Sequence, residues 1–214
     1  MLEIDRTQGR RAFGEDPEGY KGARPDYPSV LYEILETHCG LRPGTRTFEI
    51  GPGPGLATRH LLELGASPLT VIEPDPRLAK FLAGKLGAAF PQLDIQVGTF
   101  EEVTLPPSAF DLGACASAFH WIDESVGLRK AARMLVPGGW WAMWWNVFSD
   151  TAGDDPFHQA TQPLLKVLER SPAQGSSIRP GFALDVDSRI AAMKSVDDFT
   201  DISYQIVERK IVYD

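Results

Sequence analysis

The chain has 214 residues, of which 43% are hydrophobic and 23% are charged, so it is long enough to bury the core of one α/β domain. Its formal net charge of −8 argues against a nucleic-acid partner, because such a partner would require a basic face. A polar N-terminus and the lack of a run of about 20 apolar residues predict a cytoplasmic protein without a signal peptide or a membrane span.

The first 40 residues are expected to form an arm and a cap helix. Residues 1–19 show no hydrophobic periodicity, which predicts an arm that is either flexible or ordered over a bound ligand. Apolar residues at helical spacing over about 29–38 then predict an amphipathic helix.

From about residue 46 the chain alternates short apolar runs with amphipathic segments. The pattern predicts strands at about 46–50, 69–73 and 93–97, separated by helices over 56–64 and 76–86. This alternation is typical of a doubly wound, mostly parallel sheet with helices on both faces and a ligand at the carboxyl ends of the strands.

The first predicted strand runs into a turn with three alternating glycines, Gly51, Gly53 and Gly55. Glycine accepts backbone angles that other residues avoid and lets a ligand lie directly on the peptide groups. Glu73, at the end of the second predicted strand, is typical of an acid that accepts hydrogen bonds from a ribose diol. The alternative is a glycine turn that serves only tight strand-to-helix packing.

Glu49, which ends the first strand just before the glycines, helps to decide between ligands. A carboxylate there would repel a pyrophosphate but would suit a ligand that carries an ammonium and a sulfonium group. The glycines also fail the dinucleotide pattern G-x-G-x-x-G/A in both frames. An NAD(P)-dependent oxidoreductase therefore stays as a disfavoured alternative.

The stretch Glu49-Ile50-Gly51-Pro52-Gly53-Pro54-Gly55 resembles the first motif, E/D-x-G-x-G-x-G, of the class I S-adenosylmethionine-dependent methyltransferases. The resemblance covers about residues 20–146. It implies a Rossmann-like sheet of the seven-stranded type and S-adenosylmethionine as the cofactor. The implied cofactor-binding residues in and after the motif are Glu49, Gly51, Gly53, Gly55 and Glu73.

The resemblance also implies cofactor contacts at the ends of the third and fourth strands, from Thr99, Phe100 and Ala116. Similar methyltransferases often have Asp at the position of Thr99, where it reaches the adenine amino group, so Thr99 departs from the family pattern. For Phe100, a contact with the adenine ring and a place in the core are both open.

A segment Tyr...Arg-Pro-x-Tyr-Pro precedes the first helix of similar methyltransferases, and here it spans residues 20–28. The resemblance implies that Tyr20 or Arg24 meets the cofactor or a substrate carboxylate. The equally open alternative is a surface ion pair for Arg24 and a packing role for Tyr20.

A fourth strand is predicted over 110–116 and runs into a loop that contains His120 and Trp121. In similar small-molecule methyltransferases this loop faces the transferable methyl group. His120 is therefore the candidate general base and Trp121 a candidate substrate contact. The competing interpretation is that His120 only packs or caps the loop.

A helix over 124–135 and a Pro-Gly-Gly turn lead to a fifth predicted strand over 140–145. Its tryptophans are typical of a core, and Asn146 at its end is a candidate substrate residue.

The rest of the chain predicts a helix over 155–170, a loop over 171–181, a short helix near 188–193 and a β-like run over 199–212. Two alternatives stay open for the last part: the sheet lacks its last strand, or residues 199–214 bend into a hairpin.

We thus expect one domain in three parts: an arm and cap helix over 1–40, a cofactor-binding core over 41–150, and a C-terminal helix, loop and final strand region over 151–214. The expected function is methyl transfer to a small-molecule acceptor by a monomer or a homodimer, with no nucleic-acid or membrane partner. A catalytically inactive cofactor-binding protein is the second alternative. Cys39 and Cys115 predict two reduced thiols and no zinc site.

Overall fold

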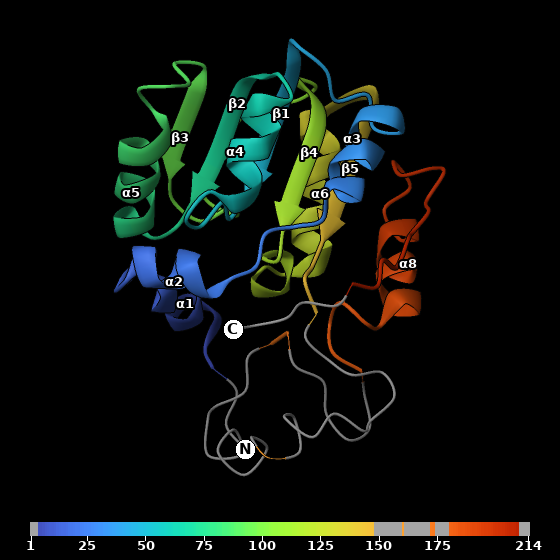
Figure 1. Ribbon diagram of the computed structural model, residues 1–214. Helices are drawn as coiled ribbons and strands as arrows, with labels where there is room; N and C mark the ends of the chain where they lie inside the picture. Colours follow the sequence, from blue (N-terminus) through green and yellow to red (C-terminus); the bar gives the residue numbers. More distant parts are fainter. Residues whose placement is uncertain (1–3, 148–159, 161–171, 174–179, 210–214) are drawn as a thin grey trace.

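One parallel sheet of five strands, in the order β3-β2-β1-β4-β5, forms the centre of the protein (Figure 1). The computed structural model describes residues 4–147, 160, 172–173 and 180–209. The strands are β1 (Thr45–Ile50), β2 (Ala66–Glu73), β3 (Leu93–Val97), β4 (Phe110–Ala116) and β5 (Leu135–Trp144). The predicted doubly wound fold is confirmed, and the strand order changes direction between β1 and β4, where such sheets bind ligands.

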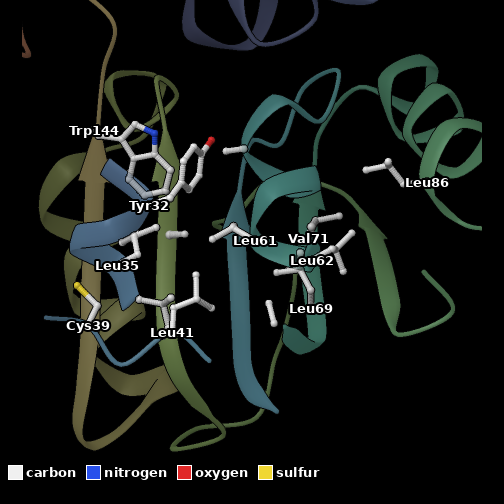
Figure 2. Close-up of a cluster of buried hydrophobic side chains, with 14 of the residues drawn as sticks. Tyr32, Leu35, Cys39, Leu41, Leu61, Leu62, Leu69, Val71, Leu86 and Trp144 are labelled. Atoms are coloured by element: carbon white, nitrogen blue, oxygen red, sulfur yellow. The ribbon is translucent and has the colours of Figure 1, made fainter. Parts of the chain in front are cut away.

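Helices cover both faces of the sheet. Buried side chains of α3 (Ser29–Thr37), α4 (Leu56–Glu63) and α5 (Pro76–Leu86) share one apolar cluster with the strands (Figure 2). A second cluster includes side chains of α6 (Glu124–Met134), and α8 (Val186–Lys194) packs against that helix.

The two clusters follow from the alternation of side chains along a strand. Val71 packs into the first cluster and its neighbour Ile72 into the second, and Ala114 and Cys115 divide in the same way. Both faces of the central strands are buried, which explains why β4 is continuously apolar over residues 112–116 rather than alternating.

Two helices that start at the carboxyl edge of the sheet, α5 and α6, are capped by acids. The side chain of Asp75 accepts a hydrogen bond from the Arg77 N–H at 2.9 Å, and Pro76 follows it as the first residue of α5. Asp123 caps α6 by accepting from the Val126 N–H at 3.1 Å. These caps place the loops after β2 and β4 at defined positions beside the edge.

The N-terminal segment is ordered and lies across the carboxyl edge of the sheet (Figure 1). It consists of α1 (Arg6–Gly9), a 3₁₀ turn over Ala12–Gly14 and α2 (Pro17–Ala23). The segment therefore takes the second of the two forms expected for it, an arm ordered over the region where a ligand would bind.

Two predictions near the C-terminal part need correction. β5 begins at Leu135 rather than at 140, because Phe110 pairs with Leu135, Leu112 pairs with Trp140, and the register shifts between them. The β-like run is wrong over 199–209, where no strand forms, because its apolar residues have no neighbouring strand to pair with in the described ranges.

The short helix predicted near 188–193 is confirmed as part of α8. The helix predicted over 155–170 lies outside the described residues apart from residue 160, as does most of the loop over 171–181. Within the described ranges, no helix combines the length and the apolar character that crossing a membrane requires.

Candidate active site

A cavity of about 970 Å³, including its solvent-open mouth, lies at the carboxyl ends of the strands. Its walls come from the turn after β1, the end of β2, the loops after β3 and β4, and the N-terminal segment. The predicted site residues that line it are Tyr20, Arg24, Gly51, Gly53, Glu73, Thr99, Phe100, Ala116, Trp121 and Asn146. Three predicted site residues, Glu49, Gly55 and His120, do not line it.

The three glycines of the turn after β1 have positive φ angles of 63°, 55° and 86° but differ in their surroundings. A Cβ atom on Gly53 would have only Tyr20 Cε1 near it, at 3.9 Å, so the bare peptide faces the cavity. A Cβ atom on Gly55 would meet Leu82 Cδ1 at 2.4 Å, which means that Gly55 is needed for packing against α5. Both interpretations of the glycine turn therefore apply, each to a different glycine.

Glu73 joins the end of β2 to this turn. Its Oε2 accepts a hydrogen bond from the Gly53 N–H at 3.0 Å, and its Oε1 accepts from the Asp75 N–H at 2.9 Å. Burial raises the pKa of the Glu73 carboxyl to about 7, although the two N–H donors oppose that rise. The carboxyl group thus stands at the cavity wall beside the exposed peptides of the glycine turn.

Glu49 is fully buried beneath the turn, and neither of its carboxylate oxygens has a hydrogen-bond partner in the described part of the chain. Burial raises the pKa of Glu49 to about 8; the nearby Thr58 hydroxyl, outside hydrogen-bond geometry, opposes the rise, and Glu73 adds to it. Both acids lack a cationic side-chain partner among the described residues. Two buried carboxyl groups without a cationic partner, beside exposed peptide groups, suit a ligand that carries positive charge.

The wall after β3 is mainly apolar. Phe100 is 3% exposed and its ring stacks on Phe48 in the core, with ring centroids 6.3 Å apart, yet the residue also lines the cavity. Lys130 of α6 donates to the Phe100 carbonyl at 2.5 Å and so holds this loop in place. The Thr99 hydroxyl donates to Glu102 at 2.8 Å. Pro74, Leu78 and Ile122, from the segments after β2 and β4, add further apolar side chains to the lining.

The N-terminal segment supplies one wall, and Arg10, which was not predicted as a site residue, anchors it. Arg10 donates two hydrogen bonds to Glu101, at 2.6 and 3.1 Å, and two more to the Trp121 carbonyl. A Cβ atom on Gly9 would lie 2.0 Å from the Trp121 ring, so the segment packs closely on that side chain. The arm carries no periodic pattern, and no signal in the sequence marks these long-range contacts.

Aromatic side chains line the same wall. The rings of Phe13 and Tyr20 lie 4.7 Å apart, and the Arg24 guanidinium lies over the Tyr20 ring, 5.2 Å from its centroid. Arg24 is exposed and has no ion-pair partner among the described residues, so the predicted surface ion pair does not form there.

The loop after β4 presents Ser117 rather than His120 to the cavity. Ser117 has a positive φ of 53°, which is uncommon for a residue with a side chain, and its Oγ accepts a hydrogen bond from the Tyr27 hydroxyl at 3.0 Å. The two residues were not predicted as part of the site. At the end of β5, Asn146 donates to the Pro25 carbonyl at 3.0 Å.

His120 is 7% exposed and lies outside the cavity lining. Its Nδ1 is 3.3 Å from Trp145 Nε1, which donates to it, and its ring also contacts Trp121 and Phe182. Burial, together with the charges of Arg24 and Arg6, lowers the pKa of His120 to about 4. This geometry matches a neutral histidine that packs the loop, and it does not place the imidazole beside a reacting atom.

The described residues contain no group of three or more His, Cys, Asp or Glu side chains arranged to hold a metal ion. Cys39 and Cys115 are both buried and unpaired, as expected from their separation in the sequence.

Residues 48–143 match the family model of a methyltransferase domain. The chain is 27% identical to an uncharacterized methyltransferase of Schizosaccharomyces pombe over 80% of its own length and 67% of that protein. It is 30% identical to an uncharacterized methyltransferase of Mycobacterium tuberculosis over 66% of its own length and 55% of that protein. The chain thus spans between about half and two thirds of these two relatives.

The fold is similar to that of a candidate S-adenosyl-L-methionine-dependent methyltransferase from Methanococcus maripaludis. The TM-score is 0.62, the identity is 16%, and the similarity covers 97% of this chain and 90% of that one. At this identity the similarity supports the fold alone.

Proposed function

Since the chain belongs to the class I S-adenosylmethionine-dependent methyltransferases, we propose that it transfers the methyl group of that cofactor to a small molecule. The observation that carries the proposal is the bare peptide of Gly53 at the cavity wall, with the Glu73 carboxyl hydrogen-bonded beside it. An oxidoreductase is no longer a competing hypothesis, because the family assignment replaces it.

The residues of the cavity fit the proposed cofactor in charge and in shape. Glu73 accepts hydrogen bonds from the ribose hydroxyls, as acids at the end of the second strand do in nucleotide-binding sheets. The peptide groups of Gly51 and Gly53 lie against the amino-acid end, whose ammonium group favours ionisation of the Glu49 carboxyl buried beneath the turn. The apolar wall around Phe100 and Thr99 takes the adenine.

A small acceptor is favoured over RNA by charge. The net charge of −8 gives no general attraction to a phosphate backbone, and the N-terminal segment supplies one wall of the cavity. The cavity walls formed by the N-terminal segment and the loop after β4 carry aromatic rings and hydroxyl groups, which suit a compact organic molecule.

In the proposed reaction the chain binds the cofactor and the acceptor, orients them towards each other and excludes water from the cavity. When bound, S-adenosylmethionine supplies a methyl group on a sulfonium, which is already activated for displacement. The cavity walls hold the acceptor in line with that group, and the N-terminal segment covers the edge of the sheet above it. His120 supports the loop after β4, since it lies outside the cavity lining.

The test begins with calorimetric titration of the protein with S-adenosylhomocysteine, with NADH as the control ligand. We expect saturable binding of the first and none of the second. Transfer of labelled methyl groups to a panel of small metabolites then separates the enzyme from a catalytically inactive cofactor-binding protein. Failure of S-adenosylhomocysteine to bind would remove the proposed function, and binding without transfer to any member would favour the inactive protein.

A further inference from the structure

The cavity has two halves of different chemistry. One half is formed by the ends of β1, β2 and β3, with Gly53, Glu73 and Phe100. The other half is formed by the N-terminal segment and by the residues that follow β4 and β5. Because the first half has the features of a nucleoside site, the second is where an acceptor would lie.

The second half carries positive charge without a negative partner. Arg24 lines it, and its guanidinium has no carboxylate within ion-pair distance in the described part of the chain. The other lining arginine, Arg10, is already held by Glu101. Glu73 is the one acidic residue among the described lining residues, and it is held in the first half by the N–H groups of Gly53 and Asp75.

Hydroxyl groups in the second half are arranged as donors. The Tyr27 hydroxyl donates to Ser117 Oγ at 3.0 Å, so the hydrogen of the Ser117 hydroxyl remains available to a ligand. Ser117 is held at this wall by its left-handed backbone conformation at the end of β4. A guanidinium group and a free hydroxyl hydrogen on the same half complement an anion.

Among its described residues, the same half offers no group that could take a proton. None of the described lining residues is His, Lys, Cys or Asp. Burial raises the pKa of both Tyr20 and Tyr27, so the two phenols stay protonated, and His120 lies outside the lining. An alcohol or a phenol would need a base before it could attack, and a protonated amine would also be repelled by Arg24.

We propose, on the basis of the proposed function, that the acceptor is a small carboxylic acid, bound as its carboxylate beside Arg24 and Ser117 and converted to a methyl ester. A lone pair of the carboxylate oxygen forms the new O–CH₃ bond. The S–CH₃ bond breaks and leaves its electron pair on sulfur, so the carboxylate and the sulfonium charges disappear together. No proton moves in this step, which matches a cavity wall without a base.

The experiment uses methyl-labelled S-adenosylmethionine with a panel of aliphatic and aromatic acids, each paired with the alcohol and the amine of the same carbon skeleton. Alkali releases methanol from a methyl ester but not from an ether or a methylamine, so alkaline treatment identifies the product class. We expect alkali-labile label from acids, at a rate that is constant from about pH 6 to about pH 9, where carboxylates are fully ionised.

Alkali-stable label on the alcohols or amines would overturn the inference and leave the proposed function intact. Lack of transfer to every acid, with S-adenosylhomocysteine binding preserved, would also overturn the inference. Loss of S-adenosylhomocysteine binding itself would instead overturn the proposed function, so the two failures are distinguishable.

Arg24→Gln tests the residue assignment. We expect the KM for the acid to rise about tenfold or more, with S-adenosylhomocysteine affinity within about threefold of wild type and partial rescue by Arg24→Lys. Arg59→Gln, which changes an exposed arginine paired with Glu63 on α4, is the matched control and should alter neither value. Weaker S-adenosylhomocysteine binding with an unchanged KM would assign Arg24 to the cofactor and overturn its role with the acceptor.

Discussion

Replacement of Glu73 is the sharpest test of how the cavity binds a nucleoside. In the wild-type protein its carboxyl group accepts hydrogen bonds from the N–H groups of Gly53 and Asp75 and is 2% exposed. Glu73→Ala removes both of these bonds and also the acceptor proposed for the ribose hydroxyls. The variant should therefore lose affinity for the cofactor and some stability.

The two losses have separate magnitudes. A hydrogen bond to a charged group contributes about 1.5–3 kcal/mol, which corresponds to a loss of affinity of roughly tenfold to a hundredfold. The buried Asp75 N–H left without an acceptor costs about 1–3 kcal/mol, enough to lower the Tm by several degrees, whereas the part-buried Gly53 N–H faces the cavity and costs less. Glu73→Gln keeps the shape and one acceptor oxygen, so both effects should be smaller in that variant.

Isothermal titration with S-adenosylhomocysteine measures the first effect, and thermal unfolding followed by circular dichroism measures the second. Glu63→Ala is the matched control, because Glu63 is an exposed acid on the neighbouring helix and its ion pairs, with Arg59 and His60, lie at the surface. If folded Glu73→Ala bound S-adenosylhomocysteine as tightly as wild type, the assignment of Glu73 to the ribose would be wrong.

Three further predictions concern the turn, the loop after β4 and the buried acid. Gly53→Val should mainly weaken S-adenosylhomocysteine binding, because its side chain would enter the cavity. Gly55→Ala should mainly lower the Tm, because its Cβ would meet Leu82. Equal losses of S-adenosylhomocysteine affinity in the two variants would contradict these separate roles of the two glycines. His120→Ala should lower the Tm, while the methyl-transfer rate at saturating substrate stays within about threefold of wild type. A rate loss of about a hundredfold, together with a wild-type rate that depends on a single ionisation, would support His120 as the general base. Burial raises the pKa of Glu49 from 4.5 to about 8, so the folded state binds the Glu49 carboxyl proton more tightly than the unfolded state does. The resulting contribution to the free energy of unfolding is complete below about pH 4.5 and is lost as the pH rises towards 8. Glu49→Gln should therefore raise the Tm of the ligand-free protein more at about pH 8 than at about pH 5, and an equal change at both values would show that Glu49 is already ionised.

The central sheet could be predicted because its signals are local. Apolar runs and helical spacing placed β1 to β4 and α3 to α6 within a few residues of their observed bounds. The glycine turn and Glu73 were found in the same way, because a strand end and its turn are contiguous in the chain.

The missed features depend on contacts between distant segments. Arg10 reaches Glu101 and Trp121, about a hundred residues away, from an arm without any periodic pattern. The predicted position of His120 in the loop after β4 was correct. The sequence pattern does not show, however, that its side chain points towards Trp145. The β-like run over 199–209 has strand-forming residues, yet propensity alone cannot form a strand without a partner.

The two halves of the cavity differ in how freely their sequences can change. Residues of the nucleoside half lie at strand ends, where a substitution also disturbs the sheet and the packing of Gly55 on α5. The facing wall depends on a short N-terminal segment tied down by Arg10 and by a bond from Arg77 to the Arg11 carbonyl at 2.6 Å. With those anchors kept, exchange of the intervening side chains alters the shape and charge that an acceptor meets, and the sheet is left untouched. On the proposed function, the choice of acceptor can therefore change through substitutions in this segment while the nucleoside site is retained.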